Sequence, residues 1–250
     1  MNDVLLDVRG LEKRFGALVA TDGVDLQVRR GEVHALIGPN GAGKTTFVAQ
    51  IGGQLAADRG RIVFDGHDVT SLAPHQRARR GLVRSFQITR LFKSANVLDN
   101  VALAVQAVSG SSFRTWRPMR GAAKEFERAR EVLADVGLAE KATHAIDQLS
   151  HGERRALEVG MALASRPLLM LLDEPMAGMG ADESVRMERL IDAVRATSAV
   201  LLIEHDVDAV FRLADRVSVL VGGRLIATGA PEAVRIDAGV VAAYLGDESV

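Results

Sequence analysis

The chain has 250 residues, of which 48% are hydrophobic and 25% are charged. This composition excludes a disordered or fibrous protein and fits one large α/β domain, or one domain that carries an insertion. With 31 basic and 32 acidic residues the net charge is −1. The overall charge therefore gives no reason to expect a nucleic-acid partner.

Neither cysteine chemistry nor membrane insertion is expected of this sequence. It contains no cysteine, which excludes disulfides and thiolate metal sites and is compatible with a reducing compartment. Acidic residues interrupt the apolar stretch that follows Met1, so no secretory signal is predicted. The longest apolar runs, at 167–172 and 199–203, are far shorter than the roughly 20 residues of a membrane-spanning helix. We expect a cytoplasmic protein that reaches a membrane only through a partner.

The first third of the chain predicts strands and one strand–turn–helix unit. Two short β-rich segments, separated by turn residues that include Gly16 and Gly23, indicate an antiparallel β edge. An apolar strand then runs directly into a glycine-rich turn and a helix. In chain order we predict strands at 4–8, 24–28 and 33–37, a helix at 44–55, a hairpin at 61–68, and a helix that starts at 71–74 with a candidate Ser71 cap.

The middle third changes to a helical pattern. Residues 96–166 contain amphipathic stretches and no convincing strand, which predicts an inserted helical subdomain. Within it, the polar loop 109–119 is read as a connector in preference to an exposed binding loop. We assign that loop no chemistry.

Apolar strands return in the last third and alternate with helices. This alternation predicts a mainly parallel sheet covered on both faces, hence an α/β fold. We predict one domain over 1–250, with the sheet core at about 1–95 and 167–250 and the helical subdomain at about 96–166. The returning strands are at 168–172, 199–203 and 217–221.

The most specific motif is a complete P-loop pattern between a predicted strand and a predicted helix. Its glycines allow the backbone N–H groups to approach phosphate oxygens, and the helix N-terminus and Lys44 add positive charge. Thr45 is expected to bind Mg²⁺, and Thr46 a further phosphate oxygen. The pattern consists of Gly38, Pro39, Asn40, Gly41, Ala42, Gly43, Lys44 and Thr45.

Phosphoryl transfer also needs carboxylates, and an apolar strand at 168–172 ends in two of them. Asp173 is expected in the Mg²⁺ shell, and Glu174 is expected to orient or deprotonate the attacking water. Alone, such a strand more often ends in a helix cap. Beside a P-loop, this Walker B arrangement favours a nucleotide hydrolase.

A third motif, Ser150-His151-Gly152-Glu153, reads as a capping box that opens a helix through about Leu163. Its free N–H groups can face an anion. Together with the P-loop and Walker B, the motif makes the whole chain resemble the ABC ATPases, whose signature motif occupies this position. The resemblance implies an ABC cassette with a RecA-like sheet core that binds ATP and Mg²⁺. It also implies that Ser150 to Glu153 contact the γ-phosphate held by a second ABC ATPase subunit.

Three further residues fall at family positions. Gln87 matches the glutamine that contacts Mg²⁺ and signals to the membrane subunits, and His205 matches the switch histidine at the γ-phosphate. Phe15 lies where the family places an aromatic that stacks on adenine. Without the resemblance, His205 reads as an ordinary loop residue and Phe15 as a core residue.

The sequence departs from the common family pattern at two places. His151 and Glu153 replace the usual Gly and Gln of the signature, although Glu153 preserves the capping logic. In the loop after Walker B, Gly180 stands where many members have Asp. This second departure puts the cross-subunit contacts of that loop in question.

Within the family, four segments resemble the ATPases of branched-chain amino-acid importers: 85–92, 97–101, 203–207 and 229–246. That resemblance implies transmembrane permease subunits, an extracytoplasmic solute-binding protein, a homo- or heterodimer of ATPases, and attachment to the inner face of the cell membrane. A lipopolysaccharide-export ATPase is the alternative. The cassette does not touch the cargo, so its sequence does not name the solute.

Other classes of P-loop protein fit less well. The short insertion and single cassette argue against chromosome, repair and ribosome-associated ABC ATPases, and kinases and GTP switches lack the signature. The basic cluster at 77–84 is read as a solvated helix face, because no aromatic platform accompanies it. No nucleic-acid partner is expected.

Overall fold

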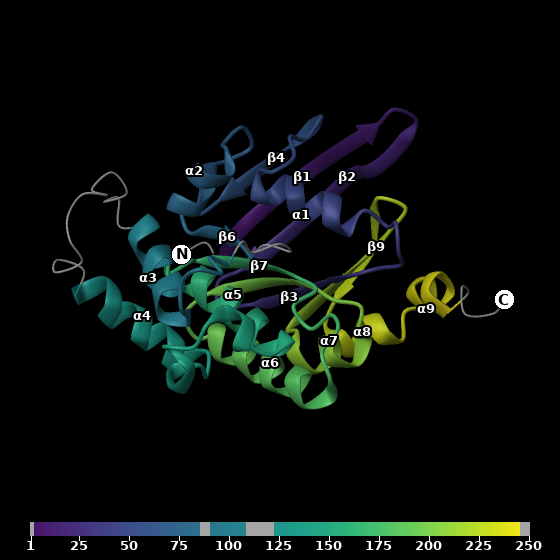
Figure 1. The fold of residues 1–250 in the computed structure, drawn as a ribbon. Helices are drawn as coiled ribbons and strands as arrows, with labels where there is room; N and C mark the ends of the chain where they lie inside the picture. The colour runs from purple at the N-terminus through teal and green to yellow at the C-terminus, as the bar shows by residue number, and fades with distance from the viewer. Residues whose placement is uncertain (1–2, 86–90, 109–122, 246–250) are drawn as a thin grey trace.

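The structure, a computed structural model, describes residues 3–85, 91–108 and 123–245. Helices and strands alternate along these ranges, and two sheets lie one above the other with α1 (Lys44–Gly52) between them (Figure 1). The residues of two predictions, Gln87 and the loop 109–119, lie outside the described ranges. The alternation confirms the predicted α/β class.

The larger sheet of the described part has six strands in the order β10-β9-β3-β8-β7-β6. Its five neighbouring pairs are parallel except the β9–β10 pair at one edge. The central strands are buried along their whole length, which explains their continuous apolar sequences. The strands are β3 (Val33–Ile37), β6 (Leu82–Arg84), β7 (Leu169–Asp173), β8 (Ala199–Ile203), β9 (Arg216–Val221) and β10 (Arg224–Gly229).

A separate antiparallel sheet has the order β2-β1-β4-β5. Its two long strands pair over far more residues than the sequence predicts, and register shifts interrupt the pairing around Gly10. Gly10 and Gly23 therefore lie at irregularities within the two long strands, whereas Gly16 lies in the turn that connects them. The strands are β1 (Val4–Phe15), β2 (Leu18–Arg29), β4 (Arg59–Phe64) and β5 (His67–Asp68).

Helices cover both faces of the larger sheet. On one face, Phe47, Val48 and Ile51 of α1 pack between the two sheets and are fully buried. The other face packs mainly against helices of the second half of the chain. These helices are α5 (His151–Leu163), α6 (Ala181–Val194), α7 (Val207–Leu213), α8 (Pro231–Arg235) and α9 (Ala238–Leu245).

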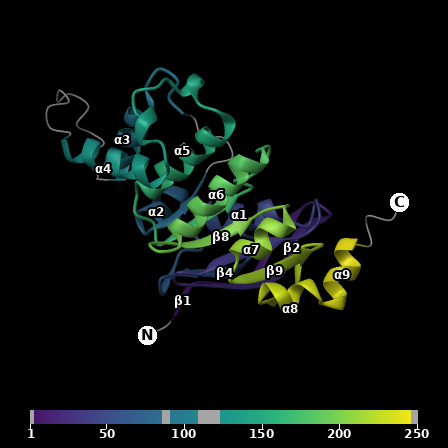
Figure 2. The same ribbon diagram turned by 90° about the horizontal axis from the view of Figure 1, so that it is seen from below.

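Figure 2 shows α3 (Val97–Val108), α4 (Ala123–Asp135) and α5 gathered at one end of the molecule, with α8 and α9 at the other. Two short 3-10 turns, Ala139–Lys141 and Ile146–Gln148, connect α4 to α5. The described residues from 96 to 166 are therefore mainly helical, while the exact subdomain boundaries stay a prediction. None of the described helices has the length and apolarity that crossing a membrane requires.

Two local predictions are wrong in detail. The helix expected to begin with a Ser71 cap is α2 (Pro74–Arg79), and its N-cap residue is Ala73. The helix predicted to run to residue 55 ends at Gly52, because Gly53 adopts a left-handed C-cap conformation with φ 80°.

The prediction that the basic cluster lies on a solvated helix face is wrong for Arg77 of α2, which is only 2% exposed. Its guanidinium donates hydrogen bonds to the carbonyls of Gln50 and Ile51, at 2.7 and 2.6 Å. Burial lowers its pKa to about 10. Arg77 therefore provides hydrogen-bond donors for carbonyls at the C-terminus of α1. The run of basic residues in the sequence does not reveal this role.

A buried histidine makes the stability of this fold depend on pH. His34 of β3 is fully buried, and its Nε2 lies 2.8 Å from Ser218 Oγ. Burial, together with the positive charge of Arg216, lowers the pKa of His34 to about 3. Because its unfolded pKa is near 6.5, the unfolded chain binds the extra proton first, so stability falls as pH drops from about 6.5 towards 3.

We expect the free energy of unfolding to decrease by about 2 kcal/mol between pH 7 and pH 5 on account of His34. Urea denaturation at the two pH values measures the change. His34→Gln, which cannot titrate, should lose this part of the pH dependence while other groups keep theirs. An identical pH dependence in both proteins would contradict the assignment.

Candidate active site

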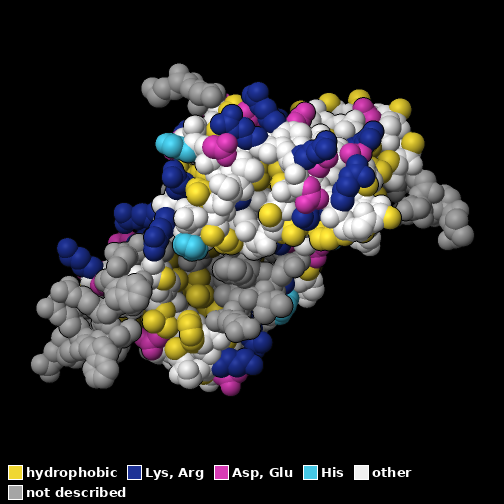
Figure 3. Space-filling view, turned by 90° about the horizontal axis from the view of Figure 1, so that it is seen from above, with side chains coloured by type: hydrophobic (Ala, Val, Ile, Leu, Met, Phe, Trp, Pro, Cys, Tyr) yellow, Lys and Arg dark blue, Asp and Glu magenta, His cyan; other side chains and the backbone are white. Residues whose placement is uncertain are grey.

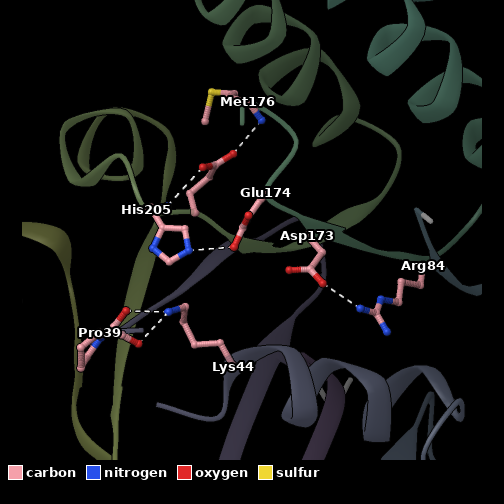
Figure 4. Close-up of polar contacts among 9 residues, drawn as sticks. Pro39, Lys44, Arg84, Asp173, Glu174, Met176 and His205 are labelled. Carbon is pink, nitrogen blue, oxygen red and sulfur yellow. Dashed lines mark hydrogen bonds and ion pairs between the residues drawn. The ribbon is translucent and has the colours of Figure 1, made fainter. Parts of the chain in front are cut away.

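The candidate site lies where three neighbouring strands end. β3, β8 and β7 are adjacent and parallel in the sheet, so the loops that follow them meet at one edge. Asp173 ends β7, Glu174 and His205 lie in the loops that follow β7 and β8, and Lys44 begins α1 after the loop that follows β3. Figure 4 shows these side chains converging. The fold thus brings together residues up to 161 positions apart that the sequence predicts from separate motifs.

The P-loop wraps closely against its surroundings and requires glycine at two positions. A Cβ on Gly38 would lie 2.0 Å from the carbonyl oxygen of Leu220, and one on Gly43 would lie 2.1 Å from that of Ala20. Gly43 has φ 103°, a conformation that strongly favours glycine. Around them, Asn40, Gly41 and Thr45 are exposed, so the loop presents an open face to a ligand.

Lys44 is held inside this loop. It is 5% exposed, and its ammonium group donates hydrogen bonds to the carbonyls of Gly38 at 2.6 Å and Pro39 at 3.0 Å (Figure 4). Burial lowers the pKa of Lys44, while the charges of Glu174 and Asp173 oppose that shift. The amine therefore stands between the loop backbone and two carboxylates, where it can meet a phosphate.

Asp173 closes β7 with a buried carboxylate that is only partly satisfied. Its Oδ2 accepts a hydrogen bond from Arg84 Nη2 at 2.7 Å, an ion pair in which the Asp173 side chain is fully buried. Among the described residues, its Oδ1 has no hydrogen-bond partner although it is buried. A buried carboxylate oxygen without a donor fits a cation ligand.

The donor set fits Mg²⁺ held jointly with a nucleotide. The described residues contain no cluster of three or more His, Asp or Glu side chains that could hold a metal. Mg²⁺ is commonly bound through one or two carboxylates together with substrate phosphates. Asp173 and Thr45, placed beside the phosphate loop, would supply the protein part of such a shell, with Gln87 as a further ligand in the prediction.

Glu174 and His205 form a pair beside this group. The imidazole Nε2–H of His205 donates to Glu174 Oε1 at 2.7 Å, and both side chains are partly exposed (Figure 4). Glu174 adopts a left-handed backbone conformation with φ 50°, which is unusual for this residue type. The loop therefore turns the carboxylate out of the strand direction and towards the histidine, where a carboxylate can orient a water.

The predicted capping box is confirmed in the structure. Ser150 Oγ accepts the N–H of Glu153 at 3.2 Å, and the Glu153 carboxylate accepts the N–H of Ser150 at 3.0 Å. A hydrogen bond from Lys141 lowers the pKa of Glu153 and favours its charged form. His151, which replaces the Gly of the common signature, donates a hydrogen bond from its ring to the carbonyl of Ala177 at 3.1 Å. It therefore links the signature to the loop after β7.

The start of α5 already holds an oxyanion within the chain. The carboxylate of Glu183, in the first turn of α6, accepts hydrogen bonds from Ser150 Oγ at 2.8 Å and from the N–H of Gly152 at 3.3 Å. A Cβ on Gly152 would lie 2.7 Å from this carboxyl carbon. Ser150 and Gly152 therefore form an arrangement that accepts an anion at close range. No described polar contact joins them to the P-loop of the same chain.

The remaining predicted residues lie at the edges of this group. Phe15, at the end of β1, is 49% exposed, so the prediction that it is a core residue is wrong. The ammonium group of Lys13 lies over its ring, 5.7 Å from the centroid. Gly180 is the N-cap residue of α6 and contributes no side-chain cap. Figure 3 shows basic and acidic side chains interspersed over the face that it views. On this face, the described side chains do not form the single-sign surface that is typical of nucleic-acid binding.

Sequence reasoning missed three residues that contact the site. Arg84 was assigned to a solvated face but pairs with Asp173, and Glu183 lies against the signature from another helix. Glu204 is buried between the Glu174 and His205 loops. Only its position beside His205 could have drawn attention to Glu204, since a carboxylate at the end of an apolar strand is exposed in most proteins.

Comparison with known proteins agrees with this geometry. A protein-family model described as ABC transporter matches residues 21–177, more than half of the chain. The branched-chain amino acid transport ATP-binding protein BraF of Pseudomonas aeruginosa is 37% identical, over 99% of this chain and 100% of its own length. The branched-chain amino acid transport ATP-binding protein LivG of Escherichia coli K12 is 35% identical, again over 99% of this chain and 100% of its own length.

Solved structures extend the agreement to three dimensions. The ADP conformation of MJ1267, an ATP-binding cassette of an ABC transporter, superimposes with a TM-score of 0.86 at 30% identity. The match covers 97% of this chain and 99% of that one. A P-loop fold with these motifs defines a nucleotide-hydrolysing cassette. The chain belongs to the ABC transporter ATPase family: it is an ATP-binding subunit that hydrolyses ATP, with Mg²⁺ as cofactor, to drive transport.

Proposed function

We propose that the chain is the ATPase of an importer for a small polar solute, namely branched-chain or other amino acids. The observation that carries this proposal is the similarity over the whole length of the chain to BraF and LivG, whose names state branched-chain amino acid transport. The resemblance at 85–92, 97–101 and 203–207 points to the same group.

The site residues divide the reaction among them in this proposal. The P-loop and Lys44 bind the phosphates, and Glu174 orients or deprotonates the attacking water beside His205. Mg²⁺, when bound, neutralises phosphate charge. The proposed assignments are Phe15 for adenine, Gly38 to Thr46 for phosphates, Thr45, Gln87 and Asp173 for Mg²⁺, and Glu174 and His205 for hydrolysis.

The proposed working unit is a pair of cassettes beneath permease subunits. Ser150, His151, Gly152 and Glu153 would face the ATP that the P-loop of a second, identical or related, subunit holds. In support of this, Ser150 and Gly152 already bind a carboxylate oxygen, that of Glu183, and no described hydrogen bond joins them to the chain's own P-loop. The sheet core (about 1–95 and 167–250) would carry the nucleotide and the helical part (about 96–166) the signature. The unit would sit on the cytoplasmic face of the membrane, with a solute-binding protein outside the cell.

Reconstitution tests the proposal directly. Proteoliposomes that contain the chain, its permease subunits and the solute-binding protein should accumulate leucine, isoleucine or valine when ATP is supplied on the cassette side. Glu174→Gln should remove that accumulation. ATP-dependent release of lipopolysaccharide without amino-acid uptake would favour the export alternative instead. Salt-sensitive binding of the chain to DNA or ribosomes would contradict a transport role.

A further inference from the structure

One buried carboxylate near the site has no part in the reaction described so far. Glu204 follows β8 directly and is only 3% exposed. A carboxylate in such a place destabilises the fold unless hydrogen bonds compensate the loss of water. Burial indeed raises the pKa of Glu204, and the nearby Glu174 charge raises it further, while the hydrogen bonds from Met176 and His205 oppose the shift. The groups that donate hydrogen bonds to this buried carboxylate therefore indicate its role.

Glu204 connects the two loops that carry Glu174 and His205. Its Oε1 accepts the backbone N–H of Met176 at 2.8 Å, and its Oε2 accepts the backbone N–H of His205 at 3.2 Å (Figure 4). Met176 stands two residues after Glu174, in the turn that follows β7. Each oxygen of one carboxylate is therefore bound to a different loop of the site.

The turn at Glu174 needs such support. A residue other than glycine in the left-handed region is held there only by its surroundings, and Glu174 has φ 50°. On one side, the N–H of Glu174 donates to the carbonyl of Ile203 at 2.8 Å. On the other side, the bond from Met176 to Glu204 fixes the chain that leaves the turn. Both anchors belong to the end of β8, next to His205.

We propose that Glu204 is a positioning residue for ATP hydrolysis. Its carboxylate fixes the Glu174 turn to the His205 loop, so that Glu174 Oε1 and His205 Nε2 stay within the 2.7 Å contact. The two N–H donors bind separate oxygens of the Glu204 carboxylate, and a carboxamide offers an acceptor oxygen at only one of these two positions. The proposal rests on the proposed hydrolytic role of Glu174.

Glu204→Gln tests this role, because the amide keeps the size of the side chain but loses one acceptor. We expect kcat for ATP hydrolysis to fall about tenfold, since one hydrogen bond to a charged group is lost. The affinity for ATP should stay within twofold, because the P-loop is untouched. Hydrogen exchange of the backbone amide of Met176 should become about tenfold faster.

Glu32→Gln is the matched control. Glu32 is also a buried carboxylate that accepts a backbone N–H, from Arg29 at 2.5 Å, and its pKa is also raised by burial. It precedes β3 at the opposite end of that strand from the P-loop. The control should therefore keep its kcat even where its melting temperature falls.

The outcomes separate this proposal from the proposed function. An unchanged kcat in Glu204→Gln overturns the positioning role, and so does a loss of ATP affinity equal to the loss of kcat. If Glu204→Gln does not fold, Glu204→Asp makes the same test, because its shorter carboxylate cannot reach both amides. Full activity in Glu174→Gln would instead refute the hydrolytic assignment itself, whatever Glu204 does.

Discussion

Glu174→Gln should bind ATP as tightly as the natural chain and lose at least about 100-fold in steady-state hydrolysis, the range of a general base. The carboxamide cannot accept a proton from water, while the P-loop and Lys44 remain in place. The amide also weakens the contact with His205, now a charge-assisted bond of 2.7 Å. Phosphate release and a nucleotide titration measure the two quantities separately.

A neighbouring acid provides the control for this variant. Asp182 is exposed in the first turn of α6, close in sequence to the loop after β7. Asp182→Asn should hydrolyse ATP at the rate of the natural chain. Equal hydrolysis in Glu174→Gln and Asp182→Asn would remove Glu174 from the reaction.

The same Glu174→Gln protein reports on the pairing of cassettes. With MgATP, trapped nucleotide should turn the monomer into a dimer in size-exclusion chromatography with light scattering, because the γ-phosphate stays available to a second signature. To bind there, that phosphate has to displace the Glu183 carboxylate from Ser150 and Gly152. ATP binding without dimer formation would point to a dissimilar partner ATPase.

The sequence predicts those parts of the site that local rules determine. The P-loop glycines, the Lys44 helix start and the Ser150–Glu153 capping box each depend on residues within a few positions, and the structure shows the capping box as predicted. The central strands are equally readable, since burial on both faces requires continuous apolar runs. Parallel order then brings the motifs to one edge of the sheet.

Contacts made across the chain were not predictable in this way. Arg84 and Asp173 are 89 positions apart and meet because β6 and β7 are neighbours. Arg77 looks like part of a charged surface, yet it is buried against the end of α1. In both cases the partner is chosen by the packing of elements, which the pattern of basic residues alone does not contain.

In the hairpin of β1 and β2, the sequence predicts strands that are shorter than those in the structure. The sequence predicts that Gly23 belongs to a turn between two short strands, and Gly23, like Gly10, has positive φ. Cross-strand pairing nevertheless continues past them, with register shifts that absorb the irregular backbone. A glycine signals a local conformation, but only the partner strand decides whether the strand stops there.

Lys44→Ala should have the largest effect on nucleotide binding, a loss of about 100-fold in affinity for ATP and ADP. Loss of a charge-assisted contact to phosphate accounts for up to about 3 kcal/mol. The loop also loses its internal support, since the Lys44 ammonium group binds the carbonyls of Gly38 and Pro39. Isothermal titration with ADP measures binding without interference from hydrolysis.

An exposed lysine distinguishes a specific effect from a general loss of charge. Lys124 lies exposed near the start of α4, and Lys124→Ala should bind ADP as the natural chain does. Because Lys44 is buried, its removal also changes the fold around it, so the melting temperature of Lys44→Ala has to be measured beside its affinity. A folded Lys44→Ala protein that still binds ADP tightly would show that the P-loop backbone alone holds the phosphates. Weak binding in Lys44→Ala and tight binding in Glu174→Gln would assign phosphate binding to the P-loop and α1, which follow β3, and water activation to the turn that follows β7.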